Sequence, residues 1–219
     1  MSKFYIYIIL LMFPILARAQ VTNDSRLWTA FSLKKEFNDL ELAFGFEYRL
    51  DENFSHTDKI LGELGAEYKI NKRLSISSTY RYSKDNDFED FSYVLSHRID
   101  IGFEYEYKIK WWGIKGLEFK NRAKYQIESA PEDRNNDAFV RNKFKLDYKK
   151  KDFSPYLSYE LFYQFNNERV INRTRIALGA KYDITKKTAI KCFYTFESRI
   201  NTNNLEYNHL YGIGYSIDL

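Results

Sequence analysis

Short stretches of this chain alternate apolar with polar or small residues, from residue 40 to the C-terminus. In the first stretch, Leu40, Leu42 and Phe44 share one face of an extended strand, because strand side chains point alternately to opposite faces. Glu41 and Glu47 lie on the other face. The alternation returns in residues 60–68, 74–82, 99–107, 117–127, 140–148, 157–165, 176–184, 190–196 and 211–219. The pattern predicts an all-β chain of ten antiparallel strands, each with one apolar face.

Aromatic residues distinguish between two kinds of β-protein. A soluble sandwich or a lipocalin-like barrel also alternates, and tyrosine is a good strand former in either. In this chain, however, successive strands place their outward rings at opposite rims. The rings of one rim are Tyr68, Tyr107, Tyr148, Tyr182 and Tyr215, and those of the other are Tyr48, Tyr82, Tyr125, Tyr163 and Phe196. Because two aromatic girdles flanking an apolar band are typical of membrane barrels, we predict a transmembrane, antiparallel, up-and-down β-barrel of ten to twelve strands.

The strand count depends on residues 20–37. Residues 27–37 also read as a strand and would pair with the next one across the Asn38-Asp39 turn. With a further short partner from residues 20–26 the barrel would have twelve strands, an even number that bacterial barrels prefer. Alternatively, this segment lies inside or beneath a ten-stranded barrel.

The connections between the predicted strands alternate between short and long. Outer-membrane barrels have short periplasmic turns and longer extracellular loops, so the long connections are expected to face outside. Short connections are expected at 38–39, 71–72, 150–152 and 185–187, and long polar ones at 51–58, 84–90, 129–137, 166–172 and 200–205. Trp111 and Trp112, in an intermediate connection, are expected to anchor the periplasmic interface.

The first nineteen residues have the features of a secretory signal peptide. Lys3 provides a basic start, residues 4–16 an apolar segment, and residues 17–19 an A-x-A cleavage site. Cleavage between Ala19 and Gln20 would leave residues 20–219 as one barrel domain. We therefore expect export to the outer membrane of a Gram-negative bacterium. The single cysteine, Cys192, excludes an internal disulfide and is expected to face lipid.

Several short motifs resemble a known family. They are Leu27-Trp28, Glu47-Tyr48-Arg49, Tyr80-Arg81-Tyr82, His97-Arg98-Ile99, Arg173-Thr174-Arg175 and the closing strand. Over nearly the whole mature chain, the pattern is similar to exported Gram-negative β-barrels catalogued as domain of unknown function 2490. The resemblance implies a barrel fold and an outer-membrane location, but no activity, because none is assigned to the family.

Charged residues dominate the positions expected to face the barrel interior. The acidic set is Glu41, Glu47, Glu63, Glu67, Asp100, Glu104 and Glu106, and the basic set is Lys120, Arg122, Lys124, Arg141, Lys143, Lys145, Arg173, Arg175 and Lys181. Acidic residues thus prevail on early strands and basic residues on later ones, which predicts two opposed walls. These walls either pair across a narrow lumen and close it or create a transverse field in a small water-filled pore.

Eight of these residues are candidates for contact with a solute in the lumen: Glu63, Glu67, Glu104, Arg122, Arg141, Lys143, Arg173 and Arg175. Inward glycines such as Gly179 and Gly212 are expected to ease curvature and to make room for large neighbours. No metal site, cofactor or nucleotide-binding glycine loop is expected from the residue spacing.

A catalytic alternative rests on Ser78 and His97. Both fall on the predicted lipid face, and a loop centred near residues 86–88 would bring them opposite each other. Such a pair resembles the arrangement of outer-membrane phospholipases, but no third residue is placed to orient the imidazole. We therefore expect a non-enzyme, with lipid hydrolysis as a minor alternative.

The leading functional hypothesis is a small porin-like channel or solute-binding barrel. The second is a structural or surface-interaction barrel with a sealed lumen. The expected partners are outer-membrane lipid and lipopolysaccharide, and the outer-membrane assembly machinery, which would recognise the closing strand with Tyr211, Tyr215 and Leu219. Nucleic-acid binding is not expected, because the formal net charge of +4 falls to +2 once Lys3 and Arg18 leave with the signal peptide. The barrel is expected to be monomeric.

Overall fold

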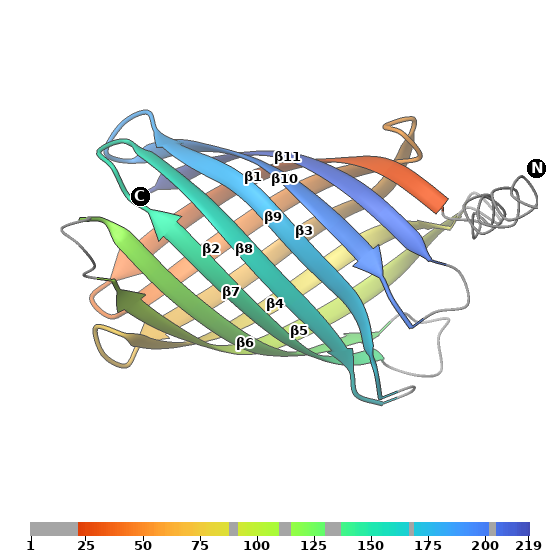
Figure 1. Ribbon diagram of the computed structural model, residues 1–219, viewed down its shortest axis with the longest axis horizontal. Coiled ribbons are helices and arrows are strands. Elements are labelled where there is room, and N and C mark those ends of the chain that lie inside the picture. Colours follow the sequence, from red (N-terminus) through yellow and green to blue (C-terminus); the bar gives the residue numbers. More distant parts are fainter. Residues whose placement is uncertain (1–21, 88–91, 110–114, 130–136, 167–168, 202–204) are drawn as a thin grey trace, which may run out of the picture.

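A computed structural model describes residues 22–87, 92–109, 115–129, 137–166, 169–201 and 205–219. These residues form a closed barrel of eleven β-strands (Figure 1). The strands are β1 Thr22–Phe37, β2 Leu40–Asp51, β3 His56–Lys69, β4 Leu74–Asp87, β5 Ser92–Lys108, β6 Leu117–Ser129, β7 Asp137–Tyr148, β8 Phe153–Gln164, β9 Ile171–Asp183, β10 Thr188–Arg199 and β11 Glu206–Asp218. The predicted all-β barrel of ten to twelve strands is confirmed. Within the described residues, no helix is long and apolar enough to cross a membrane.

The barrel closes through a parallel pair. Consecutive strands are antiparallel, whereas β1 pairs with β11 in parallel, from Thr22 opposite Glu206 to Lys34 opposite Asp218. An odd number of alternating strands makes the first and last run the same way, so a parallel closure follows from the count. Neither arrangement considered for residues 20–37 is found, because the described part of this segment is one continuous strand of the wall.

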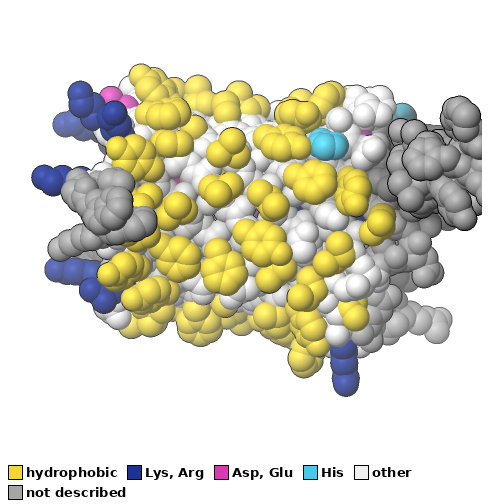
Figure 2. All heavy atoms as spheres, in the orientation of Figure 1, with side chains coloured by type: hydrophobic (Ala, Val, Ile, Leu, Met, Phe, Trp, Pro, Cys, Tyr) yellow, Lys and Arg dark blue, Asp and Glu magenta, His cyan; other side chains and the backbone are white. Residues whose placement is uncertain are grey.

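The outer face is apolar along the whole barrel. Outward side chains such as Leu64, Ile99 and Leu178 are 60%, 51% and 62% exposed. Figure 2 shows hydrophobic side chains spread over the visible wall, with most of the visible Lys and Arg side chains at one end. Six of the predicted girdle rings are more than a third exposed: Tyr68, Tyr82, Tyr107, Tyr125, Tyr182 and Tyr215. A surface of this kind is suited to lipid and not to water.

The two ends of the barrel differ, but less than predicted. Tight connections at 38–39, 70–73, 149–152 and 184–187 lie at one end. Asn38 has φ 54, a left-handed conformation that asparagine tolerates and a two-residue hairpin requires. At the other end, the predicted loops 51–58 and 84–90 are shorter, because β3 begins at His56 and β4 continues to Asp87. Trp111 and Trp112 lie outside the described residues, as do the cleavage residues Ala19 and Gln20.

Candidate solute-binding lumen

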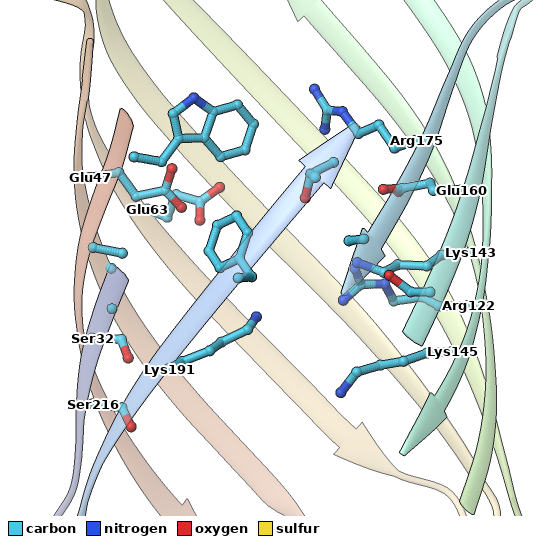
Figure 3. A pocket seen from close by; sticks show the side chains of 18 of the residues that line it. Ser32, Glu47, Glu63, Arg122, Lys143, Lys145, Glu160, Arg175, Lys191 and Ser216 are labelled. Atoms are coloured by element: carbon cyan, nitrogen blue, oxygen red, sulfur yellow. The ribbon is translucent and has the colours of Figure 1, made fainter. Parts of the chain in front are cut away.

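A cavity of about 1420 Å³ occupies the barrel interior. Its lining includes Arg26 near the beginning of β1 and Glu36 near the end of that strand. Ten residues of extended strand cover roughly 33 Å, so the cavity follows the wall over most of its length. In Figure 3, Lys191 on one side and Arg122 and Lys143 on the other project into this space. Much of the lumen is therefore open rather than filled by side chains.

The strand register places all eight candidate solute-contacting residues at inward positions. Six of them line the cavity: Glu63, Arg122, Arg141, Lys143, Arg173 and Arg175. Glu67 and Glu104 share the inner face but are not part of the cavity lining. Glu67 lies opposite Glu41, and a carboxylate oxygen of Glu104 lies 3.9 Å from Lys120 Nζ.

The prediction of two walls of opposite charge is wrong. Several inward carboxylates on the early strands have a nearby arginine: Glu47 lies 2.5 Å from Arg49, and Glu63 lies 2.6 Å from Arg81. On the later strands, Arg141 lies 2.8 Å from Glu160. Inward charges are costly without a partner in a confined lumen, so local pairing between neighbouring positions replaces a separation of sign across the barrel.

Most of these ion pairs do not bridge the lumen. They join residues on one strand, as with Lys145 and Asp147 at 2.6 Å, or on adjacent strands, as with Arg175 and Glu197 at 2.5 Å. Among the described residues, the ion pair whose partners lie on the most widely separated strands joins Lys59 on β3 with Glu128 on β6, at 3.9 Å. Pairing along the wall leaves the cavity unobstructed by ion pairs between opposite walls.

Aromatic side chains inside the barrel contact several of the inward arginines. Arg49 lies over the Trp28 ring at 4.0 Å, and Arg141 and Arg175 lie over Phe162 at 4.5 and 4.8 Å. Cation–π contacts of this kind hold the guanidinium groups flat against the wall. Arg175 also lies over the Trp28 ring, at 5.3 Å, so these contacts link arginines of β7, β9 and β2 through the rings of β8 and β1.

Two inward glycines receive aromatic rings, as predicted. A Cβ atom on Gly212 would lie 2.0 Å from the Phe193 ring, and one on Gly179 would lie 2.6 Å from the Tyr156 hydroxyl oxygen. Both rings therefore approach the strand backbone closely, with their tips over the glycines. This arrangement keeps large side chains out of the middle of the lumen.

The candidate catalytic residues are not brought together. Ser78 lies opposite Ile101, whereas His97 lies opposite Tyr82 and shares a 2.7 Å hydrogen bond between its Nδ1 atom and the Tyr80 hydroxyl. The assumed register was wrong because β4 and β5 extend further than the predicted loop allowed. Among the described residues, no group of three or more His, Cys, Asp or Glu side chains is placed to hold a metal ion.

A family comparison covers most of the barrel. The family described as "Protein of unknown function (DUF2490)" matches residues 25–208, from within β1 to within β11. The chain belongs to this family. No curated protein matches this DUF2490 chain.

Solved structures share its fold at low sequence identity. The beta domain of the Bordetella autotransporter Brka is 8% identical, with a TM-score of 0.52, over 80% of this chain and 82% of that one. An anion-selective porin from Comamonas acidovorans is 13% identical, with a TM-score of 0.38, over 81% of this chain and 52% of that one. At these identities the likeness to the autotransporter domain shows a common barrel fold and nothing about activity.

Several lumen residues of this DUF2490 protein were not among the sequence candidates. Trp28, Tyr156, Phe162, Phe193 and Lys191 all line the cavity. Their positions in the alternating pattern are inward and could have identified them. The predicted solute contacts are limited to charged residues, and this choice leaves out the four inward rings.

Proposed function

We propose that this protein is an outer-membrane channel for small solutes and that its lumen favours anions. The observation that carries the proposal is the charge of the cavity lining, which holds 18 Lys and Arg side chains but 12 Asp and Glu side chains. A confined lumen with an excess of one sign concentrates ions of the other sign. Export by a cleaved signal peptide, residues 1–19, belongs to the same proposal.

Three features support a channel over a sealed barrel. The cavity touches the wall near both ends of β1. Ion pairs such as Glu63 with Arg81 run along the wall. Two inward rings, Phe193 at Gly212 and Tyr156 at Gly179, lie against strand backbone. Together they leave an open path through the lumen. Carboxylates in its lining are paired with nearby cations, and cations remain in excess.

The outer surface supports the location. The apolar wall has exposed rings towards its rims and is suited to outer-membrane lipid, and the polar ends would meet periplasm and lipopolysaccharide. The barrel fold resembles that of outer-membrane proteins. We further propose that the assembly machinery recognises β11, whose outward residues include Tyr211 and Tyr215, and that the barrel acts as a monomer.

The test is the reversal potential of single channels across a salt gradient in a planar bilayer. We expect steady conductance steps and a reversal potential with the sign of the chloride equilibrium potential. Lys143→Glu should shift the reversal potential towards the cation value. Lys35→Glu makes the same charge change on the outward face of β1 and should leave it unchanged.

Two results would overturn this proposal. A correctly inserted but silent barrel would exclude a channel and favour a structural or surface-interaction role. Cation preference in the unmodified protein would mean that the cationic surplus of the lining does not control permeation.

A further inference from the structure

Three successive rungs of the β6–β7 ladder pair a cation with a cation on the inner face. Lys120 lies opposite Lys145, Arg122 opposite Lys143, and Lys124 opposite Arg141. Like charges directly opposite each other in a sheet are destabilising. Three such rungs in sequence therefore need either local carboxylates or another source of negative charge.

Carboxylates neutralise the two outer rungs. Lys120 Nζ lies 2.6 Å from Glu106, and Lys145 Nζ lies 2.6 Å from Asp147. In the other outer rung, Arg141 lies 2.8 Å from Glu160 and Lys124 lies 3.6 Å from Asp100. Every cation of these two rungs thus has an acidic partner within 4 Å.

The middle rung differs from both of its neighbours. Within the described part of the chain, neither Arg122 nor Lys143 has a carboxylate within ion-pair distance. The acidic residues beside them in the register are engaged elsewhere. Glu104, opposite Arg122, is turned to Lys120, and Glu160, opposite Lys143, accepts two hydrogen bonds from Arg141. The positive charge of the middle rung is therefore exposed to the cavity that both side chains line.

A third cation approaches this rung from another part of the wall. Lys191 on β10 lies within electrostatic range of Lys145 and Arg122. Lys143 lies within range of Glu160, which partly offsets its charge, and of Arg122 and Lys191. Figure 3 shows Lys191 projecting towards the side of the cavity that carries Arg122 and Lys143. The Lys191 ammonium lies 5.2 Å from the Tyr156 ring centroid. The carboxylates that act on it, Asp147 and Glu47, are already paired with Lys145 and Arg49.

We propose that Arg122, Lys143 and Lys191 form a binding site for a phosphate-type anion inside the lumen. A guanidinium group can bind two oxygens of such an anion at once, and ammonium groups bind it as point charges. A multiply charged anion held there would offset the repulsion within the middle rung. The inference rests on the proposed channel for its physiological use, where it assigns phosphate-bearing solutes as the preferred class.

The test measures binding separately from conduction. Inorganic pyrophosphate is titrated by calorimetry into the refolded protein in detergent at low ionic strength. Arg122→Gln combined with Lys143→Gln should weaken binding about tenfold or more, because hydrogen bonds to charged groups are lost. The matched control, Lys34→Gln with Lys151→Gln, removes the same charge from the cavity lining at the end with short turns and should stay within about threefold of the unmodified protein.

Lys191→Gln alone tests whether β10 contributes to the site together with β6 and β7. This variant should also weaken pyrophosphate binding. Removing cations from a repulsive rung should not harm folding, which the circular dichroism of each variant checks. Should the double variant misfold, the Lys191 variant decides.

The inference fails if the unmodified protein does not bind pyrophosphate, or if the Arg122/Lys143 pair and the Lys34/Lys151 pair weaken binding equally. Binding by a barrel that does not conduct would overturn the channel and leave the anion site standing. Conduction without pyrophosphate binding would overturn the anion site and leave the channel standing.

Discussion

Arg122 and Arg141 are the same residue type but have different surroundings in the lumen. Both are inward arginines on adjacent strands. Arg141 is buried and donates two hydrogen bonds to Glu160 and one, of 3.0 Å, to Gln126. Arg122 lines the open cavity, and the described residues provide it with no carboxylate partner. Arg141 therefore stabilises the barrel wall, whereas Arg122 is accessible from the cavity.

Substitution of these two arginines should separate their roles. Arg141→Ala leaves the Glu160 carboxylate buried without its partner and should lower the free energy of unfolding by about 3 kcal/mol or more. Arg122→Ala removes a like-charge neighbour of Lys143 and should cost less than about 1 kcal/mol. Denaturant unfolding of both variants in lipid vesicles makes the comparison. Equal losses would mean that Arg122 also has a structural partner.

The glycines under the inward rings give a second prediction at this scale. Gly212→Ala would place a Cβ atom 2.0 Å from the Phe193 ring. The ring would have to move into the lumen, which should destabilise the barrel by about 1–3 kcal/mol and reduce its conductance. Gly62→Ala is the control, because a Cβ atom there meets nothing within 4 Å. Unchanged stability and conductance in the Gly212 variant would show that the ring is free to move aside.

At the scale of elements, β1 decides how the barrel closes. It pairs with β2 on one side and with β11 on the other. Its inward residues include Arg26 and Trp28, and its outward residue Phe31 stacks on Tyr215 of β11, with ring centroids 6.4 Å apart. The strand thus completes both the apolar outer band and the cationic inner wall.

Cysteine cross-linking tests the parallel closure. Ser32 and Ser216 are register partners on β1 and β11, and neighbouring strands lie close enough for a disulfide. In a Cys192→Ser background, Ser32→Cys with Ser216→Cys should cross-link under mild oxidation. Ser32→Cys with Asn208→Cys, eight residues out of register, should not. Cross-linking of the second pair alone would rule out the parallel register.

At the scale of the whole molecule, neighbouring residues of one strand lie in different environments. Lys191 lines the cavity, whereas the next residue, Cys192, is exposed on the outer face. In the proposed channel, water inside the barrel and lipid outside it would separate these two positions, although they are adjacent in sequence.

Thiol labelling in vesicles makes this separation measurable. In a Cys192→Ser background, Lys191→Cys should react with a small, charged, membrane-impermeant thiosulfonate. The native Cys192 should not react, because lipid excludes the charged reagent from the outer face. A thiol at position 191 that stays inert would indicate a closed lumen. Rapid reaction at Cys192 would mean that this face does not meet lipid.

The sequence by itself determined the strands and the two faces of the wall. Side-chain alternation is a local property of extended backbone, so Leu40 and Glu41 reveal their faces without knowledge of the partner strand. The same periodicity placed Arg122, Arg141 and Lys143 on the inner face correctly. It also located the tight turns, because Asn38-Asp39 has the residues that a two-residue hairpin requires.

Only the tertiary structure decided the register, the closure and the ion pairs. Ser78 and His97 were set opposite each other by an assumed loop, and the extended strands β4 and β5 separate them. The number of strands depends on whether β1 meets β11, a contact between the two ends of the domain. Whether an inward cation is neutralised depends on which carboxylate reaches it from a neighbouring strand. Pairing across strands joins residues that are distant in sequence, whereas alternation is fixed within a few residues.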